Sequence, residues 1–426
     1  MKRTLLFVLV VLCVLLAACA PAPTAVPTAA PPTAAPAPTT APAQPTTASV
    51  QPTAAPAAAT EATKPAATAA PKPATGEPIK IAIIGAQSGT NASLGQWMKE
   101  GVTLAVEERN AAGGIQGRPI SIVIYDDEAD PTKSVNLAQK VATDDKVVAA
   151  WATTNSTSAL ADIPIFQQYK IVQLTNGTNV DITNKGSPYV FRSCPAGPAY
   201  ENPLVDFFVK TKGYKKIAII TDTSAYGKGE ADYQEAELKV LGLTALTRQS
   251  YGIDDKDFTG QLTAILATNP EVILFGGSEI ASGLIAKQAR QLGYKGPMGG
   301  GSAIGTPLFI NTAGADIAEG IMFTGAYPTN DLNDTTKAFA VRYKARWGND
   351  PEIHGANTYD GTQLLMLAMD KAYPNLTGDA IATAFHSIKD YHGLQLGTFN
   401  VQPNGETLAA TTLGIIKGGK LTIYQP

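Results

Sequence analysis

From Ile79 onward, short apolar runs alternate with amphipathic stretches of helical length, and this order constrains the fold of the 426-residue chain more than any other feature. The first unit is a strand-like run over residues 79–84, followed after a polar loop by a predicted helix over residues 96–112. Further strands are predicted at 119–125, 147–151 and 171–174, and helices at 131–144 and 158–168. This βαβ order predicts an α/β fold in which a doubly wound parallel sheet has helices on both faces.

A second series of the same kind begins at residues 216–221, which repeat the Lys-Ile-Ala-Ile-Ile sequence that starts at Lys80. Helices are predicted at 229–241, 258–267 and 281–292, and strands at 245–251, 272–275 and 320–324. The tail over residues 396–423 is strand-rich, with turns at 404–405 and 418–419 that predict hairpins finishing one lobe. A region of about 350 residues exceeds what one compact core usually holds, so we expect two Rossmann-like lobes.

The first residues have the features of an export signal. Lys2 and Arg3 precede an apolar stretch over residues 5–16, which is too short to span about 30 Å of hydrocarbon. The following Leu-Ala-Ala-Cys sequence, which ends at Cys19, resembles the bacterial lipobox, in which the cysteine is acylated. We therefore interpret residues 1–18 as a signal peptide and Cys19 as the lipid anchor to a membrane. The alternative is an ordinary signal peptide in which Cys19 has no role.

Residues 19–76 consist of the predicted anchor and a tract made almost entirely of Pro, Ala and Thr. Such a segment buries too little apolar surface to offset the entropy lost on ordering, so we expect a disordered linker. Proline-rich chains favour extended polyproline II, which would hold the folded region away from the lipid. The composition thus predicts a domain that works outside the cytoplasmic membrane while attached to it.

Charge and cysteine content exclude several classes of protein. The net charge is −3, and the sequence has no basic run, so no nucleic-acid partner is expected. Cys194 is the single cysteine of the folded region, which therefore has no intramolecular disulfide, and we expect this thiol to be packed and inert. No second apolar run reaches transmembrane length, so the chain cannot form a permease by itself.

The sequence lacks the motifs of common enzymes and cofactor sites. The three histidines, His354, His386 and His392, have no metal-ligand spacing, and no C-x-x-C is present. There is no G-x-S-x-G elbow and no phosphate-binding G-x-x-x-x-G-K-[ST] loop. We therefore expect neither a metal nor a cofactor nor a catalytic residue, and we expect that the protein is not an enzyme.

Three loops that follow predicted strands are rich in hydroxyl and amide side chains. They lie at residues 87–93, 153–157 and 175–179. Ligands of open α/β sheets bind beyond the carboxyl ends of the strands, where neutral donors at helix starts can hold a carboxylate. The same residue types also serve as helix N-caps, which is the alternative interpretation for each of them.

The motifs that follow these strands resemble the family of periplasmic binding proteins typified by the leucine/isoleucine/valine-binding protein of ABC importers. The first part of the resemblance lies in Gly101, Ala105, Glu108, Asn110, Gly113, Gly114, Ile115, Gly117 and Arg118, and in 125–127 with Asp130 and Pro131. Later parts are Asn155 with Ser156 and Ala159, the loop 174–183, 191–192, Asp222, 226–227, 257–258, 288–290 and Gly293. The match covers essentially all of residues 79–420.

The resemblance implies two lobes that are joined by three crossings and that close on a small-molecule solute. The crossings correspond to positions near Ala196, Tyr327 and Leu396. The first lobe would then comprise residues 77–196 and 327–395, and the second 197–326 and 396–426. The resemblance also implies a monomer that works outside the cytoplasm with an ABC permease as its partner.

Ligand-binding positions follow from the same resemblance. Carboxylate-binding positions of the family match Thr154, Asn176 and Thr178, with Thr153, Asn155 and Gly177 beside them. Tyr226 matches an aromatic residue that covers the ligand, and Ser88, Asn91 and Ser93 match the loop beside its side chain. Amino-acid binders of the family place an acidic residue where this chain has Gly299 to Ser302, so Glu279 or Asp222 is predicted to take its place.

These features leave alternatives for the ligand and the role. The ligand is expected to be a branched-chain or other amino acid, or else a short amide, a urea-like molecule or an aromatic carboxylate. The same fold would also serve a ligand sensor that signals to a partner. An extracytoplasmic hydrolase is a third interpretation, in which Glu279 would be a cleft acid.

Overall fold

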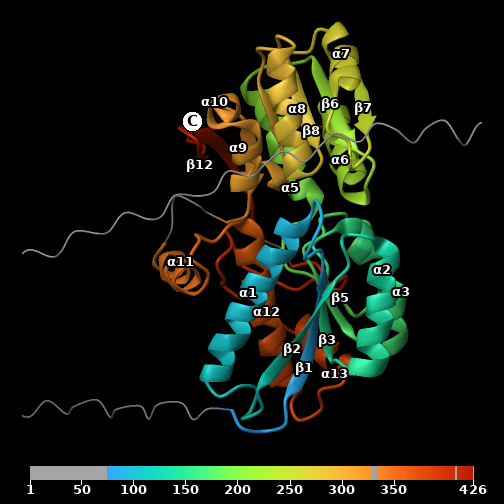
Figure 1. Cartoon of the computed structure of the whole chain (residues 1–426), viewed down its shortest axis with the longest axis vertical. Helices are drawn as coiled ribbons and strands as arrows, with labels where there is room; N and C mark the ends of the chain where they lie inside the picture. Colours follow the sequence, from blue (N-terminus) through green and yellow to red (C-terminus); the bar gives the residue numbers. More distant parts are fainter. Residues whose placement is uncertain (1–73, 328–332, 408–409, 426) are drawn as a thin grey trace, which may run out of the picture. The chain divides into compact units, whose positions relative to one another are not determined.

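The computed structural model describes residues 74–327, 333–407 and 410–425, and these form two open α/β sheets (Figure 1). The predicted signal peptide, Cys19 and nearly all of the predicted linker lie outside the described residues. Among the described residues, no helix has the length and apolar character needed to cross a membrane. The doubly wound α/β fold with two lobes, predicted from the alternation of strands and helices, is confirmed.

The first sheet has five parallel strands in the order β2-β1-β3-β4-β5. The strands are β1 (Ile79–Gly85), β2 (Ile120–Asp126), β3 (Ala149–Ala152), β4 (Val172–Thr175) and β5 (Val190–Arg192). Helices α2 (Pro131–Lys140) and α3 (Ser156–Tyr169) pack together on one face, and α1 (Ala92–Ala111) and α12 (Ile353–Ala372) on the other (Figure 1). Because both faces are covered, β1 is buried along nearly its whole length, which explains its continuous apolar sequence.

Further helices complete the first lobe. They are a π-helix (Val141–Asp145), α4 (Asp181–Asn184), α11 (Asp334–Trp347) and α13 (Gly378–His386). The sequence analysis predicted no elements between residues 325 and 395, so α11, α12 and α13 are additions from the structure. Helix α12 packs along α1 and buries polar residues such as Asn357, Thr358 and Asp360 together with its apolar ones.

The second sheet has seven strands in the order β12-β11-β10-β9-β8-β6-β7. Its parallel strands are β6 (Ile217–Asp222), β7 (Arg248–Tyr251), β8 (Val272–Gly276), β9 (Met298–Gly300) and β10 (Met322–Gly325); β11 (Thr412–Lys417) and β12 (Lys420–Ile423) add an antiparallel hairpin. Side chains of α5 (Gly197–Asp206) and α6 (Ala225–Val240) form one apolar core, and those of α7 (Thr259–Ala267), α8 (Glu279–Gln291), α9 (Pro307–Ala313) and α10 (Ala315–Ala318) form another. A π-helix (Phe207–Thr211) follows α5, and a 3-10 turn (Ser302–Ile304) follows β9.

The tail of the chain divides between the two lobes, which corrects the predicted boundary at Leu396. Phe399 and Val401 belong to the apolar core of the first lobe, and Glu406 pairs with Arg192 at the end of β5. The chain joins the second sheet only at β11. The two predicted turns thus serve different lobes, because a strand-like pattern indicates an extended segment but not the sheet against which it packs.

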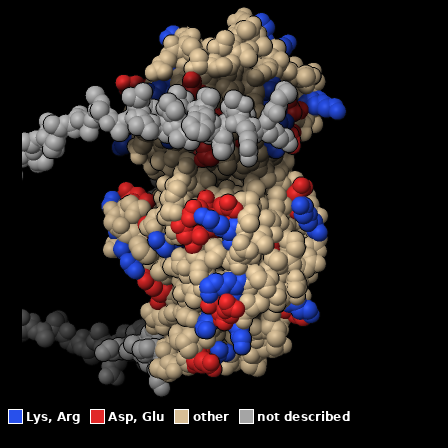
Figure 2. All heavy atoms as spheres, turned by 45° about the vertical axis from the view of Figure 1, so that its right-hand side comes forward, with Lys and Arg blue, Asp and Glu red and all other residues tan. Residues whose placement is uncertain are grey.

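The outer surface mixes charges of both signs. Figure 2 shows blue and red side chains close to one another on the face that it presents. Among the described residues, exposed ion pairs include Arg342 with Glu108 and Arg346 with Glu107, at 2.7 and 2.8 Å. Such exposed pairs contribute little to stability, so packing in the two lobes is expected to hold the fold together.

Candidate functional site

A cavity of about 570 Å³ is bounded by loops from both sheets, most of them at the carboxyl ends of strands. The first lobe contributes Gly89, Thr90, Asn91, Leu94, residues 128–131 and 154–157, Asn176, Thr178 and His354. The second lobe contributes residues 222–224, Tyr226, Ile253, Asp254, Ser278, Glu279, Ser302 and Ala303. Most of these side chains are polar, so the cavity suits a small ligand that forms hydrogen bonds.

The loop after β4 brings Asn176 and Thr178 to the cavity, as predicted. Asn176 Oδ1 accepts a hydrogen bond from Ser193 Oγ at 2.6 Å, and its buried Nδ2 has no partner among the described residues. The Thr178 hydroxyl donates to Glu230 Oε1 at 2.9 Å. Gly177 does not line the cavity; its N–H donates to Thr175 Oγ1 at 2.9 Å and so shapes the loop.

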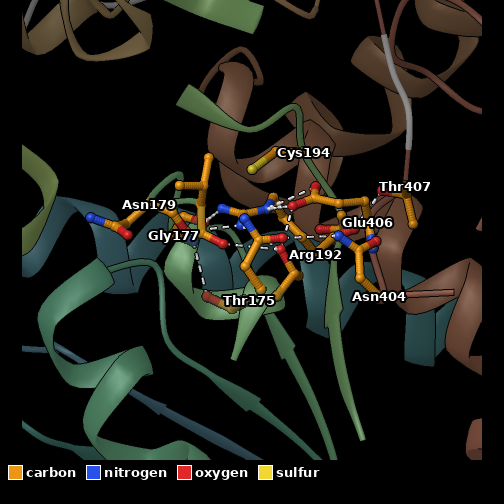
Figure 3. A network of polar contacts seen from close by, with 12 residues as sticks. Thr175, Gly177, Asn179, Arg192, Cys194, Asn404, Glu406 and Thr407 are labelled. Atoms are coloured by element: carbon orange, nitrogen blue, oxygen red, sulfur yellow. Dashed lines mark hydrogen bonds and ion pairs between the residues drawn. The ribbon is translucent and has the colours of Figure 1, made fainter. Parts of the chain in front are cut away.

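A buried arginine holds this loop in place (Figure 3). The side chain of Arg192 is fully buried and pairs with Glu406, with Nε to Oε2 at 3.1 Å. Its guanidinium also donates to the carbonyl oxygens of Gly177 and Asn179, the second at 2.9 Å, so the ends of the guanidinium bind the loop and the tail at once. The loop that carries Asn176 and Thr178 is thereby held by contacts with a buried side chain of β5.

In the loop after β3, some of the predicted residues line the cavity and others do not. Thr154 and Asn155 line the cavity, whereas Thr153 is buried outside the lining. Asn155 Oδ1 accepts from the backbone N–H groups of Thr157 and Ser158 at 2.9 and 3.2 Å and so caps α3. For the side-chain oxygen of Asn155, the capping alternative is therefore correct.

In the loop after β1, one of the three predicted side chains reaches the cavity. Asn91 lines it and occupies the N-cap position of α1 without a side-chain capping bond, so its amide remains available. Ser88 donates instead to Asp126 Oδ2 at 2.6 Å, and Ser93 lies within α1. Neither Ser88 nor Ser93 lines the cavity. Ser88 is held by Asp126, and Ser93 lies one residue, about 100° of helix rotation, from Leu94, which does line it.

The second lobe supplies an acidic wall that contains Tyr226, Glu279 and Ser302, three residues predicted from the sequence. Glu279 is the first residue of α8 and is only 5% exposed. Burial raises the pKa of its carboxyl, and the nearby His354 opposes part of this effect. Asp222, which also lies in the wall, accepts hydrogen bonds from the backbone N–H and the hydroxyl of Ser224, the N-cap of α6. One of its oxygens is thereby occupied in holding the start of this helix.

His354 is a cavity residue that the sequence analysis did not place in the site. Its Nδ1 lies 2.8 Å from Glu352 Oε2, and its ring stacks on Trp97 with centroids 5.6 Å apart. Burial alone would lower the pKa of His354, but the carboxylates of Glu352 and Glu279 together outweigh this effect and raise it. No sequence signal marks this histidine, because its partners come from α1 and from the residue two positions earlier.

Cys194 lies behind the site and contacts it only indirectly. Its Sγ is 3.3 Å from the carbonyl oxygen of Asn176, and burial raises the pKa of the thiol to about 12. Among the described residues, no group of His, Cys, Asp and Glu is arranged to hold a metal ion. The lining offers hydroxyl, amide and carboxyl groups for hydrogen bonds and charge pairing.

Comparisons with known proteins identify the family of the chain. The periplasmic binding protein family matches residues 78–420. The chain is 31% identical over 300 residues to an amino acid binding protein of Pseudomonas aeruginosa, covering 70% of this chain and 79% of that one. It is 30% identical over 314 residues to the Leu/Ile/Val-binding protein BraC3 of Rhizobium johnstonii, covering 73% and 84%.

Solved structures point the same way. The leucine-binding protein LivK of Thermotoga maritima superposes with a TM-score of 0.75 at 27% identity, covering 82% of this chain and 98% of that one. The branched-chain substrate-binding protein LivJ of Streptococcus pneumoniae, solved with isoleucine, has the same TM-score at 24% identity, which supports the fold. As its sequence motifs predicted, the chain belongs to the periplasmic binding protein family, in the group typified by the Leu/Ile/Val-binding proteins.

Proposed function

We propose that this chain is a lipid-anchored, extracytoplasmic substrate-binding protein that carries an amino acid to an ABC permease. Family membership implies a location outside the cytoplasm, and the relatives are binding proteins rather than enzymes. The cavity between the two lobes is the proposed ligand site. Ligand would stabilise the closed arrangement by its higher affinity for that arrangement, which the permease then recognises.

The observation that carries the proposal is the contrast between the two walls of the cavity. On the first lobe the two acids of the lining already have partners, since Glu128 pairs with Lys133 and Asp130 caps α2. The groups that remain for a ligand are neutral ones such as Asn91 and Thr154, which suit a carboxylate. The second lobe presents the buried carboxyl of Glu279, which suits an ammonium group. An α-amino acid carries both charges a short distance apart, so it matches both walls.

The lining also bears on the side chain of the ligand. Leu94 and Ile253 are the larger aliphatic residues of the lining, and Ile253 is 54% exposed. A leucine side chain gains affinity mainly from burial against apolar groups. We therefore propose an amino acid with a small or polar side chain in preference to leucine.

Calorimetric titration of the protein with the twenty common L-amino acids tests the proposal. We expect micromolar or tighter binding, about −8 kcal/mol or better, for at least one of them, with small or polar side chains ahead of leucine. Silence across the whole panel would contradict the amino-acid proposal.

A second candidate ligand class is a short amide, a urea-like molecule or an aromatic carboxylate. It is favoured by the stretch from Gly299 to Ser302, which lacks the acidic residue that amino-acid binders of the family place there. Ser302 lines the cavity, so a ligand without an ammonium group would meet a hydroxyl at this position. Titration with acetamide, urea and benzoate distinguishes the two classes. Binding of any of these by a protein that ignores all amino acids would establish the second candidate.

The anchor and the transport role need separate tests. Substitution Cys19→Ala is expected to release the exported protein from the membrane fraction, and mass spectrometry of the mature N-terminus should find acyl chains on Cys19 of the unchanged protein. Capture of a permease rather than a signalling protein by the liganded form would support import over sensing. Size-exclusion chromatography checks the proposed monomer.

A further inference from the structure

Two glutamates meet in the interior directly behind the cavity wall. Glu201 on α5 and Glu230 on α6 are 0% and 1% exposed. A Cβ atom on Gly301 would lie 2.2 Å from Glu201 Oε1 and 2.8 Å from Glu230 Oε2, so these two oxygens converge on the backbone of Gly301. The next residue, Ser302, lines the cavity. The acid pair is therefore separated from the ligand space by a single backbone layer.

Each glutamate has one oxygen with a donor and one without. Gln234 Nε2 donates to Glu201 Oε2 at 2.7 Å, and the Thr178 hydroxyl donates to Glu230 Oε1 at 2.9 Å. Among the described residues, neither Glu201 Oε1 nor Glu230 Oε2 has a hydrogen-bond partner, although the nearby backbone N–H of Gly301 lowers the pKa of Glu201 in part. Two ionised carboxylates in this position would repel each other strongly, whereas one proton between the two inner oxygens satisfies both.

We propose that one proton shared by Glu201 and Glu230 orients the Thr178 hydroxyl, so that Thr178 offers a hydrogen-bond acceptor to an N–H group of the ligand. A threonine hydroxyl has one proton and two lone pairs. Because the proton is donated to Glu230, the lone pairs of Thr178 remain for the cavity that it lines. The ligand part of this inference rests on the proposed function, and Glu201 and Glu230 act in it as positioning residues.

This inference revises the role that the family resemblance implied for Thr178. A hydroxyl that gives its proton to Glu230 cannot also donate to a ligand carboxylate. In the proposed arrangement the carboxylate is bound by other groups of the first lobe that line the cavity, such as Thr154. Thr178 then binds an ammonium or amide N–H on the side of the ligand that faces the second lobe.

The electrostatic surroundings favour one shared proton. Burial raises the pKa of Glu201 well above its usual value, and repulsion from Glu230 raises it further. Burial also raises the pKa of Glu230, but hydrogen bonds from Glu201 and Thr178, together with the Arg192 guanidinium, act in the opposite direction. Glu201 is therefore expected to hold the proton and Glu230 the negative charge.

Other titratable groups around the pair leave this assignment unchanged. Asp222 repels the charge on Glu230, whereas Arg192 attracts it. The remaining neighbours are a thiol and three phenols, whose pKa values burial raises, so they stay neutral near pH 7: Cys194, Tyr200, Tyr226 and Tyr233.

The bond between Thr178 and Glu230 also joins the two lobes. Three further hydrogen bonds connect the same regions: Asn179 Nδ2 to the Ala225 carbonyl at 2.8 Å, Val180 N–H to Tyr233 Oη at 2.9 Å, and Ala225 N–H to Thr157 Oγ1 at 3.1 Å. Each of them ends on α6. The acid pair therefore orients Thr178 where the loop after β4, in the first lobe, contacts α6 of the second lobe.

A pH dependence of binding follows with a definite sign. As the pH falls, a second proton binds to Glu230, which then donates toward Thr178 instead of accepting from it. The Thr178 proton turns toward the cavity, and the acceptor for the ligand N–H is lost. Because the pKa of Glu230 is raised by burial, affinity is expected to fall with decreasing pH before ordinary surface glutamates titrate.

Calorimetry with the tightest-binding L-amino acid of the panel tests the orientation of Thr178. Thr178→Val is expected to weaken binding at least about tenfold, whereas Thr178→Ser stays within about threefold because it keeps the hydroxyl. Binding to the unchanged protein should weaken about tenfold or more between about pH 7.5 and pH 5. Glu230→Gln should show a smaller pH dependence than the unchanged protein, and the part that remains is expected from Glu279, whose pKa burial also raises. Wild-type affinity in Thr178→Val, or an unaltered pH profile in Glu230→Gln, would overturn the inference.

Infrared spectroscopy of the unliganded protein tests the shared proton without a ligand. The difference spectrum between the wild-type protein and Glu201→Gln at neutral pH should contain a protonated-carboxyl C=O band that the variant lacks. Glu230→Gln, which disrupts the same shared proton, serves as the second variant if Glu201→Gln does not fold.

The two experiments fail in different ways. If the band is missing, the shared proton is refuted even when amino acids bind. If the band is present but no amino acid binds, the proposed function fails and the ligand part of the inference fails with it.

Discussion

The two walls of the cavity hold their polar groups by different means. On the first lobe, neutral groups stand on loops that are fixed from behind by Arg192 and by the cap at Asn155. On the second lobe, acids such as Glu279 stand at the first turn of a helix with burial as the main influence on their charge. The difference fits the proposed amino-acid ligand, since dipoles suit its anionic end and a carboxylate suits its cationic end.

The largest effect is expected from removal of Arg192, which holds the loop after β4 in the neutral wall. Arg192→Ala leaves Glu406 and the carbonyls of Gly177 and Asn179 without their partner. Removing one member of a buried ion pair costs about 3 kcal/mol or more in unfolding free energy, which chemical denaturation measures. Arg248→Ala, at a more exposed ion pair on the second lobe, is the control and should cost about 1 kcal/mol or less. Equal losses would mean that Arg192 does not stabilise the loop.

The acidic wall is tested at Glu279. Glu279→Ala removes the carboxylate opposite the neutral wall and is expected to weaken amino-acid binding about 30-fold or more, because an ammonium then loses its buried partner. Asp254→Ala, on the same side of the cavity, is the matched control and should change the dissociation constant about twofold or less. Calorimetry measures both. If Asp254 proved the more sensitive, the ammonium would have to lie toward that residue instead.

Two adjacent residues of the neutral wall sharpen the distinction between ligand contact and helix cap. Thr154→Ala should weaken binding about tenfold while leaving the melting temperature of the unliganded protein nearly unchanged. Asn155→Ala should instead lower the unfolding free energy by about 1 kcal/mol, because Asn155 caps α3. A large loss of unliganded stability in Thr154→Ala would favour the structural interpretation for both residues.

The smallest effect is expected at Cys194, which belongs to neither wall. Its thiol is buried, and its pKa of about 12 keeps it protonated at neutral pH. Alkylation with iodoacetamide should be slow until the protein unfolds, and Cys194→Ser should leave affinity within about twofold. Rapid labelling of the folded protein, blocked by ligand, would show that this thiol is accessible from the cavity.

The alternation of strands and helices was sufficient to predict the fold, because sheets covered on both faces require continuous apolar strands such as β1. The same reasoning missed α12, whose buried polar residues hide its helical periodicity. It also assigned the segment of Phe399 and Val401 to the wrong lobe, since periodicity does not specify a partner.

The candidate site was predictable as a set of loops but not as a set of side chains. Asn91, Ser88 and Ser93 share one loop, yet only Asn91 reaches the cavity, because the start of α1 decides which side chains turn inward. His354 meets its partner Trp97 only in the folded structure. The same is true of Glu201 and Glu230, which meet behind Gly301. No local pattern in the sequence could reveal them.

The pairing of Arg192 with Glu406 has a consequence for protein engineering. Glu406 precedes the stretch through which the chain enters the second sheet at β11. Arg192 binds both Glu406 and the loop after β4, so it holds this part of the tail and the loop together in the first lobe. An insertion after Thr407 would lengthen the connection between the lobes and leave the Arg192–Glu406 pair and the loop after β4 unchanged. An insertion before Glu406 would loosen both, which makes this position suitable for adjusting affinity and interlobe motion together.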